Sequence, residues 1–200
     1  AKKDRSTDLE GSTLSETVLE LPTWDLSDLY EGVEDPRIEA DLEASLERAR
    51  RFEERYRGRI AVPDLKARTL REALDEYEAL QRLAGRPQSF AGLLYATDTT
   101  DPRRGALVQR TQEVGSRIAT HLLFFDLEIG RIPEERWALL APEAALADYR
   151  HYLEYQRLVA RYCLSEPEEK VLEETANCRG RAFRRLFTEL VSRLKYPMEL

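Results

Sequence analysis

The chain has 200 residues, of which 42% are hydrophobic, and it carries a formal net charge of −7. Its longest apolar runs, such as residues 122–125, are far shorter than the roughly 20 residues that cross a bilayer, which excludes a membrane span. The acidic balance disfavours a protein that mainly binds phosphate backbones, and residues 1–20 lack the apolar centre of a signal peptide. We therefore expect a cytoplasmic protein that does not bind nucleic acid.

Residues 1–20 are polar and are expected to form a flexible arm, followed by a helical region over residues 21–200. In that region Asp35 and Pro36 have the pattern of a helix N-cap followed by proline in the first turn. The apolar residues after them recur at steps of three or four, which predicts one buried helical stripe: Ile38, Leu42, Leu46, Ala49, Phe52 and Tyr56. Gly58 is a typical helix stop.

Two more helices are predicted before residue 100. The first starts at Thr69 and carries an apolar stripe as far as Ala84. Residues 85–87 (Gly-Arg-Pro) are expected to interrupt it, because proline disfavours helical backbone in the residue before it. The second helix then starts at Ser89.

The longest apolar pattern follows a turn at residues 99–102 and predicts a central helix with one side buried along its whole length. Its members recur at steps of three or four: Leu107, Thr111, Val114, Ile118, Leu122, Phe125 and Ile129. Leu123, Phe124 and Leu127 add apolar groups on its other faces. The end of this helix is therefore expected to be covered on several sides.

Three further helices are predicted to start at Pro133, at Pro142 and at a capping box formed by Ser165 and Glu168. The last of them carries an apolar stripe of Phe183, Leu186, Phe187, Leu190 and Leu194. No segment shows the sustained period-2 alternation of a strand. The sequence thus predicts an all-α fold, an antiparallel array of about seven to nine helices. The alternating residues 193–200 are expected to be the start of a truncated strand.

The histidines and cysteines do not form a recognisable metal site. His121 falls on the apolar side of the central helix and is predicted to lie at the core boundary, and His151 is predicted to join a surface cluster with Asp148 and Glu154. Cys163 and Cys178 lack metal-ligand spacing and are predicted to be buried, reduced thiols. We expect no catalytic residue, metal ligand or cofactor in these 200 residues.

Tyrosines are the candidates for substrate binding. Tyr152, Tyr155 and Tyr162 fall near one face of a predicted helix, and phenols can stack on a peptide while donating to its carbonyls. Packing at the core or its boundary is the alternative for each of them. The basic residues between 179 and 195 are interpreted as partners of the acidic residues 166–174, not as a nucleic-acid surface.

Four segments carry a family resemblance: residues 21–30 (LPTWDLSDLY), 93–102 (LLYATDTTDP), 121–129 (HLLFFDLEI) and 181–190 (RAFRRLFTEL). In their order and spacing they resemble the N-terminal helical region of oligoendopeptidase F and its thimet-like zinc metallopeptidase relatives. From the residue types alone, Trp24 is expected to anchor the first of these segments to the helices, and Asp25 or Ser27 to cap the following turn.

The resemblance implies a hydrolase that is much longer than this chain. Its zinc site, an H-E-x-x-H motif with a further glutamate, would lie in a C-terminal catalytic region, and its N-terminal helices would form one wall of a channel for short unstructured peptides. We therefore expect this chain to be a channel wall that is inactive alone, and that exposes a large apolar patch or self-associates when its partner region is missing. A free-standing helical module that binds a peptide or a protein is the alternative.

Overall fold

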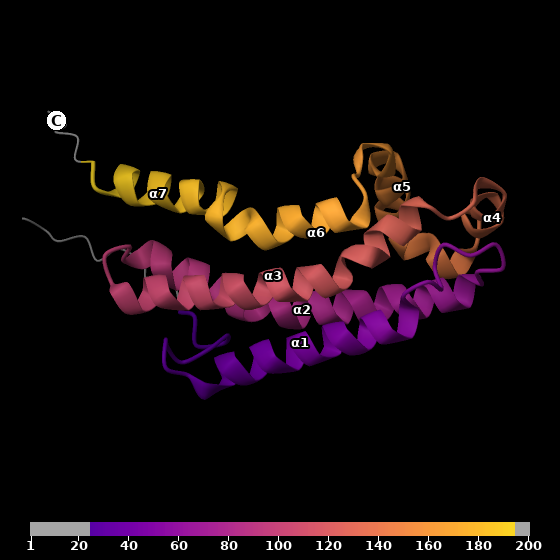
Figure 1. The fold of residues 1–200 in the computed structure, drawn as a ribbon. Helices are drawn as coiled ribbons and strands as arrows, with labels where there is room; N and C mark the ends of the chain where they lie inside the picture. Colours follow the sequence, from indigo (N-terminus) through magenta and orange to yellow (C-terminus); the bar gives the residue numbers. More distant parts are fainter. Residues whose placement is uncertain (1–24, 195–200) are drawn as a thin grey trace, which may run out of the picture.

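The computed structural model describes residues 25–194 (Figure 1), and every regular element among them is helical. The all-α prediction is confirmed. The α-helices are α1 (Pro36–Tyr56), α2 (Ala67–Thr97), α3 (Pro102–Gly130), α4 (Glu134–Leu140), α5 (Arg150–Val159), α6 (Glu166–Thr175) and α7 (Gly180–Ser192). Short 3-10 helices follow α4, α5 and α6, namely η1 (Ala144–Tyr149), η2 (Ala160–Tyr162) and η3 (Ala176–Cys178). The predicted arm, Trp24 and residues 195–200 of the predicted strand start lie outside the described residues.

Helices α1, α2 and α3 form an antiparallel three-helix body, because short connections place each helix against its predecessor (Figure 1). Helix α6 packs along α3, and α7 continues from α6 on the same side of the body. Helices α4 and α5 lie at the end of the array where α3 finishes. No helix of the described part is long and apolar enough to cross a membrane.

The ends of α1 lie where the sequence places them. The Asp35 carboxylate accepts a hydrogen bond from the Arg37 amide at 2.9 Å, which caps the helix start beside Pro36. After the helix, Gly58 has a positive φ of 74°, a conformation that only glycine adopts without strain. All six residues of the predicted stripe are buried.

Helix α2 differs from the prediction. It starts at Ala67, two residues before Thr69, and runs without interruption through Gly85, Arg86 and Pro87. The cost of an internal proline, about 3 kcal/mol, is offset by tertiary contacts on both sides of it. Pro87 itself is buried, the ring of Phe90 packs edge-on against Tyr30 at 5.2 Å, and the Arg86 guanidinium donates to the carbonyl of Leu29 at 2.7 Å.

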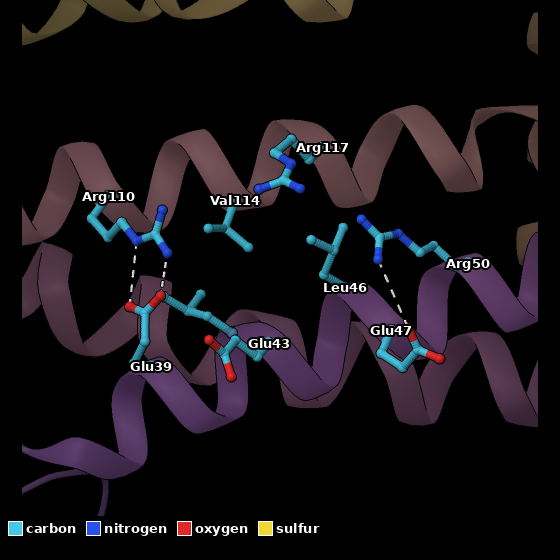
Figure 2. Close-up of a pocket in the computed structure, with 9 residues that line it drawn as sticks. Glu39, Glu43, Leu46, Glu47, Arg50, Arg110, Val114 and Arg117 are labelled. Carbon is cyan, nitrogen blue, oxygen red and sulfur yellow. Dashed lines mark hydrogen bonds and ion pairs between the residues drawn. The ribbon is translucent and has the colours of Figure 1, made fainter.

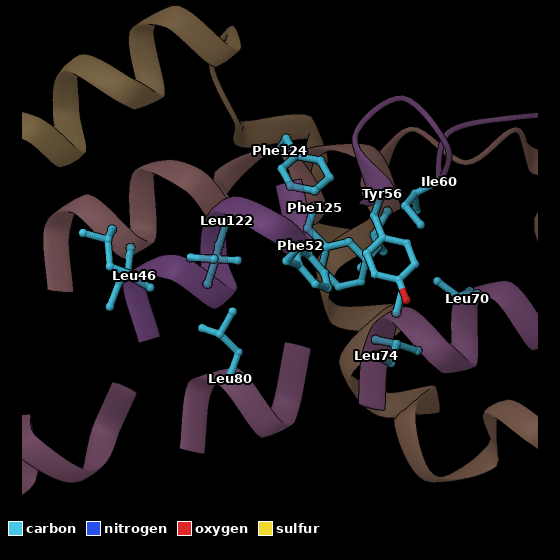
Figure 3. Packing of buried hydrophobic residues seen from close by; sticks show 14 of the residues in the cluster. Leu46, Phe52, Tyr56, Ile60, Leu70, Leu74, Leu80, Leu122, Phe124 and Phe125 are labelled. Atoms are coloured by element: carbon cyan, nitrogen blue, oxygen red, sulfur yellow. The ribbon is translucent and has the colours of Figure 1, made fainter. Parts of the chain in front are cut away.

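The core lies between the three long helices and is centred on Phe52 (Figure 3). The Phe52 ring lies 4.8 Å from Tyr56, 5.1 Å from Phe125 and 5.9 Å from Phe124, in tilted or edge-on arrangements that favour aromatic pairs. Six members of the predicted stripe of α3 are buried: Thr111, Val114, Ile118, Leu122, Phe125 and Ile129. Phe124 and Leu127 are buried on other faces, so the prediction that several sides of α3 are covered near its end is confirmed.

The C-terminal part is divided more finely than predicted. The Ser165 and Glu168 capping box is present at the start of α6, with the Glu168 carboxylate accepting from the Ser165 amide at 2.9 Å. The predicted single helix after it is interrupted by η3, which separates α6 from α7. Likewise, the segment after Pro142 begins as a 3-10 helix before α5.

Candidate functional site

The structure separates the three candidate tyrosines. Tyr152 lies half-buried on α5 and faces α2 and α3, where its ring packs 6.3 Å from that of Tyr77. Tyr155 on α5 and Tyr162 on η2 are exposed, at 55% and 73% of their surface. The Arg161 guanidinium stacks over the ring of Tyr162 at 4.9 Å. One phenol is therefore part of a polar cluster, and two are open to solvent.

Tyr152 belongs to a cluster of four polar side chains at the junction of α2, α3 and α5, here called the Asp126 cluster: Tyr77, Gln81, Asp126 and Tyr152. The Tyr152 hydroxyl donates to Asp126 Oδ1 at 2.6 Å, and Gln81 Nε2 donates to the Tyr77 hydroxyl at 2.9 Å. Tyr77, Asp126 and Tyr152 are half-buried, whereas Gln81 lies exposed at the edge of the cluster.

The electrostatics of the Asp126 cluster follow from its burial. Desolvation raises the pKa of Asp126, although the hydrogen bond from Tyr152 favours the charged carboxylate and opposes that shift. Burial, with the nearby Asp126 charge, also raises the pKa of Tyr152 and raises that of Tyr77 to about 12. Both phenols therefore remain protonated donors at neutral pH.

Two open grooves share the Asp126 cluster as a wall. One has a volume of about 250 Å³ and is lined by Leu74, Tyr77, Glu78, Gln81, Tyr149 and Tyr152. The other has a volume of about 370 Å³ and includes Tyr77, Gln81, Asp126 and Glu169 in its lining. The smaller groove exposes only apolar surface, whereas the larger one exposes polar groups that can hydrogen-bond to a peptide backbone. The arrangement can bind or orient a chain, but it presents no nucleophile activated by a base.

Sequence reasoning found Tyr152 but missed its partner. Asp126 stands alone among apolar residues in the segment 122–127, and a single acid in such a run indicates a buried carboxyl with a specific hydrogen-bond donor. The apolar residues around Asp126 had already predicted that several sides of α3 are covered near its end. An acid at that place therefore signals a buried polar cluster, and this signal was missed.

The raised pKa of Asp126 predicts a pH-dependent contribution to stability. The folded chain holds the Asp126 proton to a higher pH than the unfolded chain, in which the pKa is near 3.8. Compared with the Asp126→Asn variant, the free energy of unfolding should therefore fall as the pH rises from about 3.8 through the pKa of Asp126 in the folded chain. Urea unfolding of both proteins over this range measures the difference. A difference that is constant with pH would contradict the prediction.

A third groove lies between α1 and α3 (Figure 2). Its floor is apolar, with Leu42, Leu46 and Val114, and charged side chains of both signs form its sides. Arg110 pairs with Glu39 across the groove, whereas Arg117 has no ion pair among the described residues. Arg117 also lines an adjoining groove beside α6 that includes Ser116, Thr120 and Asn177. Polar groups thus follow α3 on the side that α1 and α6 flank.

The described residues do not fit a zinc ion. His121 lies at the core boundary as predicted, but its Nδ1 atom is 2.5 Å from Glu53 Oε2 and is engaged there. His151 is exposed on α5. In residues 25–194 no three His, Cys, Asp or Glu side chains are grouped closely enough to hold a metal. The predicted burial of Cys163 and Cys178 is wrong: Cys163 directly follows η2, Cys178 is the last residue of η3, and both are exposed.

Helix α7 has inverted polarity. Its residues that face the body are polar, and Arg181 and Glu189 are the only two residues of α7 that are not exposed. Its apolar residues point away from the body, and we call them the outward face of α7: Phe183, Leu186, Phe187, Leu190, Val191 and Leu194. Phe183 and Phe187 are 71% and 66% exposed. The large apolar patch on one side stays a prediction, and these exposed side chains support it.

The described residues thus form an all-α array in which one apolar helix face is uncovered, and such a face marks an interaction surface. The comparison with family models agrees with this class: the model described as oligopeptidase F matches residues 128–196. The resemblance to the N-terminal region of oligoendopeptidase F is confirmed by this match. The matched residues include the segment 181–190, whereas the segments at 21–30 and 93–102 lie before them. Searches of curated proteins and of solved structures found no match.

Proposed function

We propose that this chain is the N-terminal channel-wall region of a zinc oligopeptidase that hydrolyses short unstructured peptides. The match to the oligopeptidase F family over residues 128–196 is the observation that carries the proposal. In this proposal the zinc ion and the reacting groups belong to a C-terminal catalytic region of the same polypeptide, and the enzyme acts in the cytoplasm.

The architecture supports a wall. Three long helices with a common aromatic core form a stiff body, and polar grooves follow α3 on one side of it. A wall of this kind admits a chain by exposing polar groups without binding one side chain tightly. Tyr155 and Tyr162 are candidates to contact substrate directly because they are exposed, and Tyr152 is a candidate through the grooves beside the Asp126 cluster.

A peptidase assay tests the proposal. A short quenched fluorescent peptide is incubated with the 200-residue chain and with the polypeptide extended beyond Leu200 by its own reading frame. We expect no cleavage by the 200-residue chain with or without zinc, and chelator-sensitive cleavage by the extended polypeptide. Chelator-sensitive cleavage by the 200-residue chain, or a reading frame without H-E-x-x-H, would overturn the proposal. In the second case a free-standing helical binding module remains.

A further inference from the structure

We infer that the outward face of α7 is the docking surface for the catalytic region, and that the element it receives is apolar with carboxylates along its borders. The inference rests on the proposed function and names the surface through which the two regions join. It depends on three features of α7: which side faces the body, what lies uncovered, and which charges border the uncovered side.

The side of α7 that faces the body is a polar stripe at helical spacing: Arg181, Arg185, Thr188 and Ser192. Arg181 Nη2 donates to Glu173 Oε1 at 2.9 Å, and Ser192 Oγ lies 3.1 Å from Thr99 Oγ1. Glu189 beside this stripe accepts from the Tyr95 hydroxyl at 3.2 Å. Such contacts are exposed or half-exposed, and each contributes little to stability because water competes for the same groups.

The opposite side of α7 repeats the same spacing with apolar residues at positions 183, 187, 190 and 194. Burial of one large apolar side chain stabilises a structure more than a solvent-exposed polar contact does, so each of these residues has more to gain than any contact of the polar stripe. The side of α7 that would gain most from burial therefore points away from the body. A helix of this kind fits between two layers, and the described residues supply only one of them (Figure 1).

The borders of the outward face indicate the charge of the second layer. Arg184 lies seven residues before Val191 and Arg193 seven residues after Leu186, so one arginine flanks each border. Neither arginine forms an ion pair within residues 25–194, whereas Arg185 and Arg181 on the inner side are paired. The only acid of α7, Glu189, is turned inward. Two copies of α7 placed face to face would meet arginine with arginine, which disfavours a second copy as the occupant.

Cysteine labelling tests the inference. Leu190→Cys is introduced together with Cys163→Ser and Cys178→Ser, in the 200-residue chain and in the extended polypeptide, and the rate of reaction with a fluorescent maleimide is measured. We expect labelling at least about tenfold slower in the extended polypeptide. Glu54→Cys on the exposed side of α1 is the matched control, and should label at the same rate in both proteins.

The charge of the borders is tested in the same extended polypeptide. Adding Arg184→Glu and Arg193→Glu should restore faster labelling at position 190, whereas Arg48→Glu, an exposed arginine of α1, should not. Equal labelling rates at position 190 in the two proteins would overturn the inference. The inference would also be overturned if the cysteine at position 190 labelled slowly in the 200-residue chain and that chain sedimented as a dimer. A second copy would then be the occupant of the outward face.

Failure of the inference and failure of the proposed function give different results. If the extended polypeptide cleaves peptides in a chelator-sensitive way while position 190 labels freely, the channel-wall function stands and the docking surface is wrong. If position 190 is protected but no peptide is cleaved, a second layer covers α7 and the peptidase function is wrong.

Discussion

Glu128→Ala should lower the free energy of unfolding by about 2–3 kcal/mol, because one carboxylate holds the whole turn between α1 and α2. Glu128 lies near the end of α3, and its Oε1 accepts from the Gly58 amide at 2.7 Å. Its Oε2 accepts from the amide of Ile60 at 3.0 Å and is 3.4 Å from that of Ala61. Removal of the carboxylate leaves partly buried N–H groups without an acceptor, beside a residue whose side chain is in the core.

Urea unfolding of three variants measures this effect. Glu128→Gln keeps one acceptor oxygen and should lose roughly half as much stability as Glu128→Ala. Glu135→Ala is the control: it removes an exposed carboxylate on α4, close to Glu128 in the sequence. It should change the free energy of unfolding by no more than about 0.5 kcal/mol. Equal stability of the Glu128→Ala and Glu135→Ala variants would show that the turn does not depend on the carboxylate.

Gly130→Ala should cost about 1–3 kcal/mol, because α3 and α5 touch at this residue. A Cβ atom on Gly130 would lie 2.5 Å from the Cβ of Ala160 and 3.6 Å from the Gln156 carbonyl oxygen. The Ala160 methyl group cannot turn aside, because it is fixed to the backbone, whereas the Gln156 oxygen is at an ordinary van der Waals distance. The helices must therefore move apart.

Two further variants isolate this contact. Gly115→Ala lies in the same helix with nothing within 4 Å of the new Cβ, and should stabilise the chain by up to about 1 kcal/mol through helix propensity. Ala160→Gly removes the opposing methyl group, so the double variant Gly130→Ala with Ala160→Gly should be more stable than the two single effects predict. Strict additivity in this double-mutant cycle would rule out the contact as the cause.

The sequence predicted those parts of the fold that depend on the local conformational preference of a residue or on the spacing of apolar residues within one helix. The stripe of α1, its Asp35 cap and its stop at Gly58 follow from local rules, and so does the capping box at Ser165. The predicted break at Pro87 was wrong because the rule concerns an isolated helix. Buried contacts around Phe90 and Arg86 outweigh the lost hydrogen bond, and they involve residues some sixty positions earlier in the chain.

The candidate site was predictable in part. Tyrosine spacing singled out Tyr152, yet it could not separate that residue from Tyr155 and Tyr162, because the separation depends on how α5 packs against α2 and α3. The stripe on α7 was visible in the sequence as amphipathicity. Amphipathicity alone does not say which side meets the body, and here the polar side does.

The inverted polarity of α7 gives the array two levels of cooperativity. Helices α1, α2 and α3 share one core and open together, whereas α7 can detach from them at the expense of a few solvent-accessible contacts. During synthesis the three-helix body can fold before any later segment emerges, with α7 remaining loosely attached. Amide exchange in α7 would therefore report on whether its outward face is covered, independently of the stability of the core.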